Sequence, residues 1–111
     1  MTAISEKVTA LVRTMCATDE YRTYRRLQRK LDADDELRGR VDAYRRDRMD
    51  AERDGEDVFA RTDEVRRRYD ALLAEPGVRA YLDAENAVCR MIREVCSVIS
   101  AEVPVRLPED W

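Results

Sequence analysis

The stretch that decides the fold is VRAYLDAENAVCRMIREVCSVISAEV, which runs from Val78 to Val103 and follows Pro76 and Gly77. Its apolar and small side chains recur at steps of three, four and seven residues, which places them on one face of a helix. They are Val78, Tyr81, Leu82, Val88, Cys89, Ile92, Val95, Cys96, Ile99 and Val103. Such an apolar face must be covered by other helices, either of this chain or of a second chain. We expect the face buried in the core or in an oligomer to consist of Leu82, Val88, Ile92, Val95 and Ile99.

Four further helices are predicted on the N-terminal side of this segment. They cover about residues 2–16, 18–31, 34–54 and 56–74. Thr18 and Asp34 have the side chains that N-caps favour, and acidic residues follow each of them in the first turn, where the helix dipole stabilises negative charge. Gly55 is a typical C-terminal stop and separates the third helix from the fourth.

The predicted fold is an all-α helical bundle with a long antiparallel helical hairpin. No segment shows the alternation of a sheet strand, and 111 residues suit a single domain. The third and fourth helices form the hairpin, since a short connection makes neighbouring helices antiparallel. They carry few apolar residues, so we expect a charged arm, with the first, second and last helices supplying most of the core. The domain spans residues 1–103, and residues 104–111 follow it as an extended tail.

The charge balance argues against nucleic acid and membranes as direct ligands. The chain has 21 basic and 24 acidic residues with a net charge of −3, and they are well mixed, so no basic field favours a polyanion. No run of about 18 apolar residues could span a bilayer, and the N-terminus MTAISEKVTA lacks the features of a signal peptide. Three cysteines form no disulfide framework, which favours a reducing compartment. We therefore expect a cytoplasmic protein.

No catalytic constellation is present in the sequence. The chain has no histidine, which excludes a Ser-His or Cys-His nucleophile within it and removes the commonest co-ligand of cysteine at zinc sites. None of the glycine-rich phosphate loops or metal-binding spacings occurs. We therefore predict that the protein is not an enzyme.

The cysteines are the only candidates for holding a metal. Cys89 and Cys96 are seven residues apart, roughly 10 Å along a helix, whereas a disulfide needs Cα atoms about 4.4–6.8 Å apart. We interpret both as buried small apolar side chains and predict no cofactor. The alternative is an iron–sulfur cluster or a redox role, for which another chain would have to supply further ligands.

Glu85 is the most informative polar residue of the last helix, because its spacing points it toward the apolar face. A carboxylate in that position is costly unless it is paired and hydrogen-bonded. Its candidate partners are the many arginines or tyrosine hydroxyls on a facing helix. A structural hydrogen bond is the favoured interpretation, and recognition of a partner is the alternative.

Basic side chains gather on one side of the second helix and alternate with two tyrosines. They are Arg22, Arg25, Arg26, Arg29 and Lys30, alongside Tyr21 and Tyr24, and a second cluster is formed by Arg66, Arg67 and Arg68. Basic and aromatic residues together can bind RNA. However, acidic residues follow directly in the next helix, which favours a solvated, salt-bridged face. Docking of an acidic protein and binding of nucleic acid remain open as alternatives.

Three segments resemble the YlbF/YmcA family of small helical bacterial regulators. Residues 16–24, CATDEYRTY, resemble its S-x-E-Y-x-x-Y entry. Residues 31–37, LDADDEL, are similar to its L-x-x-D-P-E-L helix start, with Asp35 where proline is usual. Residues 75–85, EPGVRAYLDAE, resemble its N-P-x-V-x-x-Y-L-x-A-E segment, and residues 88–100 resemble the amphipathic helix that follows. The resemblance covers roughly residues 2–103.

The resemblance implies a helical protein with a long hairpin, often found as an oligomer. Family members resemble adaptors that join a partner protein to influence competence, sporulation and biofilm formation. They act through a complex that modulates an endoribonuclease in mRNA processing, and that complex can carry [4Fe–4S] clusters held by cysteines. We expect the partner-binding residues of this chain to be Tyr21, Tyr24, Arg25, Tyr81 and Glu85.

The sequence as a whole predicts a non-enzymatic regulatory adaptor. We expect protein partners and a homo-oligomer, without a membrane and without nucleic acid as a direct ligand. One alternative is a homo-oligomeric structural module whose last helix pairs only with itself. The other is a regulator that carries an iron–sulfur cluster shared with a partner, held in part by Cys89 and Cys96.

Overall fold

The computed structural model describes residues 2–53, 55 and 57–106. All regular structure in this part is helical, which confirms the all-α prediction. The helices are α1 (Thr2–Cys16), α2 (Asp19–Asp32), α3 (Asp35–Glu52), α4 (Val58–Arg68), α5 (Asp70–Leu73) and α6 (Pro76–Glu102). The predicted boundaries at residues 54 and 56, and residues 107–111 of the predicted tail, lie outside the described residues. Within the described part, no helix has the length and apolar character needed to cross a bilayer.

The two predicted N-caps are both present. The Thr18 hydroxyl accepts a hydrogen bond from the backbone N–H of Tyr21 at 3.3 Å, and Asp34 Oδ1 accepts one from the N–H of Leu37 at 3.1 Å. Each cap occupies one of the donors that the first turn of a helix leaves without an internal partner. These bonds fix the starts of α2 and α3 and therefore the turns between α1, α2 and α3.

Two helix boundaries differ from the prediction. The last helix begins at Pro76 rather than at Val78, because proline suits the first helical turn, where its missing N–H is not needed. The predicted fourth helix is divided at Tyr69, which leaves helical geometry with φ −103° and ψ 18°. The Tyr69 ring packs edge-on against Tyr44 with ring centroids 5.4 Å apart. The apolar spacing continues through this break, so periodicity does not reveal it.

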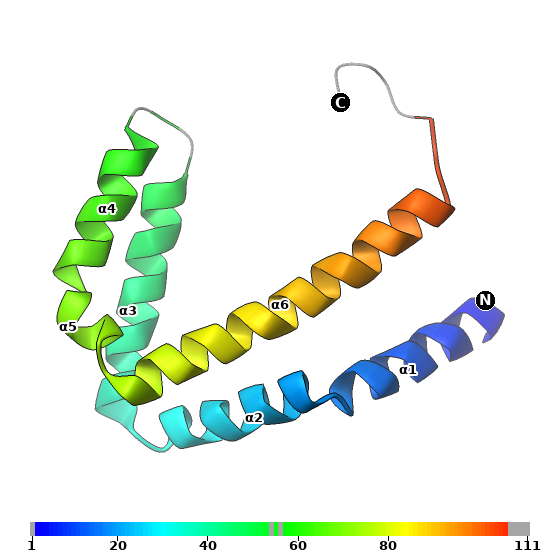
Figure 1. The fold of residues 1–111 in the computed structure, drawn as a ribbon, viewed down its shortest axis with the longest axis horizontal. Coiled ribbons are helices and arrows are strands. Elements are labelled where there is room, and N and C mark those ends of the chain that lie inside the picture. The colour runs from blue at the N-terminus through cyan, green and yellow to red at the C-terminus, as the bar shows by residue number, and fades with distance from the viewer. Residues whose placement is uncertain (1, 54, 56, 107–111) are drawn as a thin grey trace.

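The helices form two arms that meet at a corner (Figure 1). One arm is the antiparallel hairpin of α3 and α4, as predicted, and the other is α2 lying along the first part of α6. We call the second arm the stem. Helix α1 continues beyond α2, and the end of α6 extends in the same general direction.

The core lies at the corner and along the hairpin, and the prediction of its location was wrong. Its buried residues come from α2 to α6: Leu31, Val41, Tyr44, Ala51, Val65, Leu72, Val78, Tyr81 and Ala84. Helix α1 contributes no buried residue. In the hairpin, a thin apolar stripe is enough to form this part of the core, with Val41, Tyr44, Ala51 and Val65 buried, whereas Met49 and Phe59 are exposed. The wider stripe of α1 lies beyond the end of the stem, where none of the described helices buries it.

The end of α3 is capped by a side chain from across the hairpin. Arg61 on α4 donates hydrogen bonds to the carbonyl oxygens of Arg53 at 2.9 Å and Ala51 at 3.4 Å. Gly55, in the connection, has φ +138°, a conformation that disfavours any side chain. Gly55 therefore suits the turn between the two helices. Arg61 supplies hydrogen bonds to carbonyl groups that have no partner within α3.

Candidate functional site

A cluster of four side chains joins the hairpin to the stem. It consists of Tyr24 on α2, Arg45 on α3, and Tyr81 and Glu85 on α6, and we call it the corner cluster. The rings of Tyr24 and Tyr81 stack with centroids 5.7 Å apart. Arg45 Nη2 lies 2.6 Å from Glu85 Oε2, and Arg45 Nη1 donates to the Tyr81 hydroxyl at 3.4 Å. The Tyr81 hydroxyl in turn lies 3.3 Å from Glu85 Oε2.

The surroundings of Tyr81 in the cluster favour its neutral form. Burial raises the pKa of the Tyr81 phenol above its ordinary value, and the neighbouring Tyr24 acts in the same direction. Tyr81 therefore keeps its proton and can donate it in a hydrogen bond to the carboxylate. The Glu85 side chain is only 18% exposed, but it has a guanidinium and a hydroxyl as partners. This arrangement offsets most of the cost of burying its charge.

The structure brings together four of the five residues for which sequence predicted partner binding. Tyr21 is half-buried, with its ring centroid 6.2 Å from that of Tyr24. Arg25 is exposed and hydrogen-bonds Gln28 of its own helix at 2.6 Å, so it takes no part in the cluster. Whether any of the five binds a partner stays a prediction. Sequence reasoning missed Arg45, because its place four residues after Val41 defines a face of the third helix but not the residue that the face meets.

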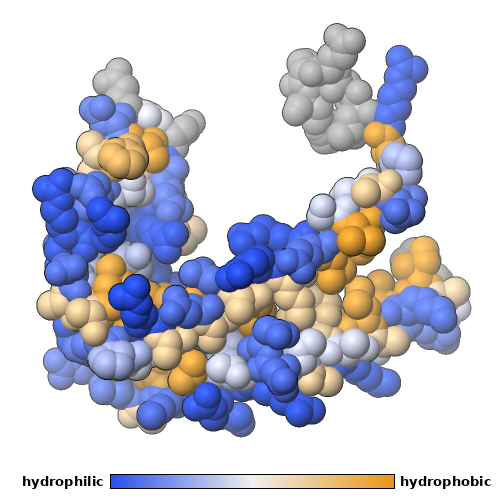
Figure 2. Space-filling model, in the orientation of Figure 1, coloured by the Kyte–Doolittle hydropathy of each residue, from blue (hydrophilic) through white to orange (hydrophobic). Residues whose placement is uncertain are grey.

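A second candidate site is the apolar surface that the fold leaves uncovered. Figure 2 shows apolar side chains gathered along α1 and along the outer part of α6. On α1, Val8 is 53% exposed, and on α6, Ile92 is 46% and Ile99 53% exposed. We define the α1/α6 surface as the exposed apolar residues at helical spacing on these two segments: Ile4, Val8, Leu11, Val12, Ile92, Ile99 and Val103.

The predicted apolar face of the last helix is therefore divided in two. Leu82 packs against the core, while Val88 and Val95 are half-buried. Ile92 and Ile99 belong to the exposed α1/α6 surface. Part of the face serves the core of this chain, and the other part has no covering partner within the described residues.

A comparison with protein families covers almost the whole chain. Residues 4–104 match the family model described as "Control of competence regulator ComK, YlbF/YmcA". The chain belongs to this family. No curated protein and no solved structure shows significant similarity to it.

The YlbF/YmcA description is that of a regulator of competence control. In this member, the segments that resemble the family patterns converge in space. Tyr24 comes from the first segment, and Tyr81 and Glu85 come from the third, and all three meet in the corner cluster. Asp34, from the second segment, caps the neighbouring α3. The resemblance in sequence therefore corresponds to the residues that join the two arms.

The cysteines do not lie where sequence reasoning placed them. We interpreted them as buried small apolar side chains, and this was wrong, because Cys16, Cys89 and Cys96 are all exposed. Their helices extend beyond the packed corner, where little covers them. No group of three or more potential metal-binding side chains occurs within the part of the chain that the structure describes. The residues of one described chain thus do not fit a cluster that needs four cysteine ligands.

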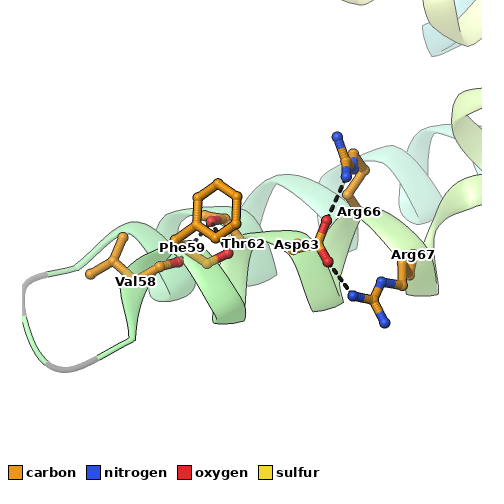
Figure 3. A network of polar contacts seen from close by, with 6 residues as sticks. All are labelled: Val58, Phe59, Thr62, Asp63, Arg66 and Arg67. Carbon is orange, nitrogen blue, oxygen red and sulfur yellow. Dashed lines mark hydrogen bonds and ion pairs between the residues drawn. The ribbon is translucent and has the colours of Figure 1, made fainter.

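The hairpin carries a groove of about 420 Å³ on one of its flanks. It is lined by Tyr44, Thr62 and Val65, together with charged side chains of both helices. Phe59, drawn on α4 in Figure 3, also lines the groove and is 86% exposed. The spacing of the predicted fourth helix places Phe59 on the same apolar face as Val65 and Leu72, but this prediction is wrong, because the Phe59 ring lies outside the core. Val58, one position earlier, is half-buried.

The arginine cluster on the same helix forms a salt-bridged face, as the favoured interpretation predicted. Arg66 and Arg67 both bind the Asp63 carboxylate (Figure 3). Arg68 lies 3.2 Å from Glu64 and 3.5 Å from Asp47 of the facing helix. Each of these arginines already has an acidic partner in the chain.

Proposed function

We propose that the protein is a non-enzymatic regulatory adaptor that acts in the cytoplasm through protein–protein contacts. The observation that carries the proposal is the exposed α1/α6 surface. Soluble proteins rarely leave a contiguous apolar patch uncovered unless it binds something. Here two helical segments present several apolar residues at helical spacing, whereas the described part of the hairpin exposes only the isolated Met49 and Phe59 as large apolar side chains.

The charges beside this surface favour a protein over a polyanion. Helix α1 carries Glu6, Lys7 and Arg13, and the outer part of α6 carries a similar mixture of signs. A mixed rim around an apolar centre is the usual anatomy of a protein interface. Apolar residues at helical spacing would dock against a partner helix or groove, with the flanking charges setting specificity more than affinity.

A photo-crosslinking experiment in the native host tests this proposal. A benzophenone amino acid replaces Val8 in one strain and Glu6 in another, two positions that point to nearly opposite sides of α1. We expect a discrete crosslinked protein from position 8 and much less from position 6. Equal crosslinking from both positions, or none from either, would contradict a specific interface at this surface.

A second candidate function is a homo-oligomeric structural module, and the same surface favours it. Two helical segments with exposed apolar faces are half of a four-helix arrangement, which a second copy could complete. Light scattering across a dilution series tests this candidate. A strictly monomeric chain at every concentration would remove it and leave a different protein as the occupant of the surface.

We further propose that the regulated process is mRNA processing by an endoribonuclease complex, with competence and related development as its outputs. Membership of the competence-control family supports competence as an output, and the resemblance to family adaptors implies the endoribonuclease complex. Removal of the gene from its host should then change the ends of a defined set of transcripts, as measured by sequencing of RNA 5′ ends. Restoration by the wild-type gene, and not by a variant with Val8→Glu, would connect the effect to the α1/α6 surface.

A further inference from the structure

The two arms of the molecule are joined over a small region compared with their length. The hairpin and the stem diverge from the corner (Figure 1), and the buried core there is formed around Val41 and Val78. From Glu85 to its end at Glu102, α6 extends about 25 Å at 1.5 Å per residue. A rotation of roughly 10° at the corner would therefore move the end of α6 by about 4 Å. The angle between the arms must be fixed by contacts close to the corner.

The ion pair between Arg45 and Glu85 is placed to fix that angle. Arg45 lies one helical turn beyond the buried Val41 on α3, and Glu85 lies one turn beyond the buried Tyr81 on α6. Both helices run outward from the corner in that direction. The pair thus connects the arms immediately outside the core, on the side where they diverge.

The geometry of the pair is constrained by a third group. Arg45 contacts both the Glu85 carboxylate at 2.6 Å and the Tyr81 hydroxyl at 3.4 Å. Tyr81 is itself held by its stacking on Tyr24 of α2. A guanidinium with two separate acceptors has little freedom to follow a moving helix. The Arg45 side chain, 42% exposed, is thus bound at two points, whereas an isolated ion pair at the surface is bound at one.

We propose that the Arg45–Glu85 pair, held by Tyr81, is a brace that sets the angle between the hairpin and the stem. The brace fixes the separation between the groove beside Phe59 on the hairpin and the α1/α6 surface beyond the stem. Arg45 and Glu85 are positioning residues in this scheme, and a partner that contacts both arms would depend on them. The brace sets the shape of the isolated chain, and this role does not depend on the proposed adaptor function.

Distances between spin labels test the brace directly. The parent protein carries Cys16→Ser and Cys89→Ser, retains Cys96 on α6, and gains Ala60→Cys on α4. Pulsed electron resonance then reports the distance between the two arms. Dilution of the labelled protein with an excess of unlabelled protein removes distances between different molecules.

Glu85→Gln is the test variant and Glu75→Gln is its matched control. Glu75 pairs with Arg40 at 3.3 Å, but both of those side chains are well exposed at the base of the hairpin. We expect the parent and the control to share one narrow distance distribution, and Glu85→Gln to broaden it and shift its mean. An unchanged distribution in Glu85→Gln, or equal broadening in the control, would overturn the proposal.

A charge exchange separates the brace from a general loss of folding. The double variant Arg45→Glu with Glu85→Arg restores opposite charges at the same two positions. We expect it to recover a distribution narrower than that of Glu85→Gln, with helix content by circular dichroism equal to that of the parent. If Glu85→Gln loses its helix content, the exchange variant decides the question, and its failure to narrow the distribution would overturn the brace.

Discussion

The Thr18 hydroxyl lies 3.8 Å from the sulfur of Met91, where the start of α2 meets α6. Beyond this contact, toward the end of α6 and back along α1, no described residue is buried. The contact therefore separates a packed half of the molecule, which holds the corner and the hairpin, from a half that is helical but uncovered. Stability and association should consequently depend on different residues.

Substitutions on the α1/α6 surface should affect association and leave folding unchanged. Val8→Glu introduces a charge into the centre of the apolar stripe of α1. We expect self-association or partner binding to weaken about tenfold or more, equal to about 1.4 kcal/mol. The free energy of unfolding of the isolated chain should change by less than about 0.5 kcal/mol, as for other exposed positions.

Thr9→Glu is the matched control, because it adds the same charge to the same helix on its polar side. Analytical ultracentrifugation measures association, and urea titration measures stability. If both variants weakened association equally, net charge rather than the apolar stripe would be responsible. If Val8→Glu unfolded the chain, the division of the molecule into two halves would be wrong.

Substitutions in the packed half of the molecule should lower the stability of the fold. Leu72 is 2% exposed and lies in the core at the corner. Leu72→Ala should lower the free energy of unfolding by about 2–5 kcal/mol through lost burial and the cavity that remains. Leu11→Ala, on the uncovered α1, removes the same atoms and should cost far less. Urea titration of both variants compares them, and equal losses would show that α1 is covered in solution.

Local signals in the sequence were sufficient for the helical segments and for the caps of α2 and α3, but not for the break at Tyr69. The Thr18 and Asp34 side chains act on backbone groups three residues away, so their roles follow from neighbouring residues alone. The position of the core could not be predicted in the same way. Apolar periodicity shows that a face exists, but it does not show whether this chain or another one covers that face. For that reason α1, with its clear stripe, was placed in the core incorrectly.

Of the Arg45–Glu85 ion pair, the sequence predicted only the role of Glu85. The spacing of the last helix showed that Glu85 needs a partner, and tyrosine hydroxyls and arginines were the expected kinds. The identity of that partner depends on how α3 approaches α6. That approach is set by packing at Val41 and Tyr81, residues that are distant in sequence. Arg45 could therefore be recognised only once the arms were placed.

The cap supplied by Arg61 gives a local prediction at the end of the hairpin. Arg61→Met keeps much of the aliphatic side chain but removes both hydrogen bonds to the carbonyl oxygens of Ala51 and Arg53. We expect a loss of about 1 kcal/mol, typical for a cap or a hydrogen bond that water can partly replace. Hydrogen exchange should accelerate in the last turn of α3 and the first turn of α4. Unchanged exchange there, with faster exchange at the corner, would contradict a local role.

The exposure of the three cysteine thiols predicts how they react. All three cysteines should react rapidly with a disulfide reagent in the folded monomer, because all three are exposed. We also expect protein purified without oxygen to be colourless and free of iron, since one chain supplies too few ligands for a four-cysteine cluster. Iron and sulfide analysis of the same sample checks this. Stoichiometric iron and sulfide in the purified chain would contradict the prediction and favour a cluster shared between copies.

The Asp63 carboxylate should make the hairpin sensitive to acid. Hydrogen bonds from Arg67 and Arg66 lower the pKa of Asp63 below its ordinary value of about 3.8. A carboxylate with a depressed folded-state pKa contributes stability above the unfolded-state pKa, and that contribution is lost as pH falls through the folded-state value. Between neutral pH and about pH 5, its contribution should therefore be constant. Asp63→Asn should be less stable than wild type in this range, and the difference should shrink as the pH falls below about 4. Urea titrations at a series of pH values measure the difference, and one that stayed constant down to the lowest pH would show that the Asp63 charge is not its source.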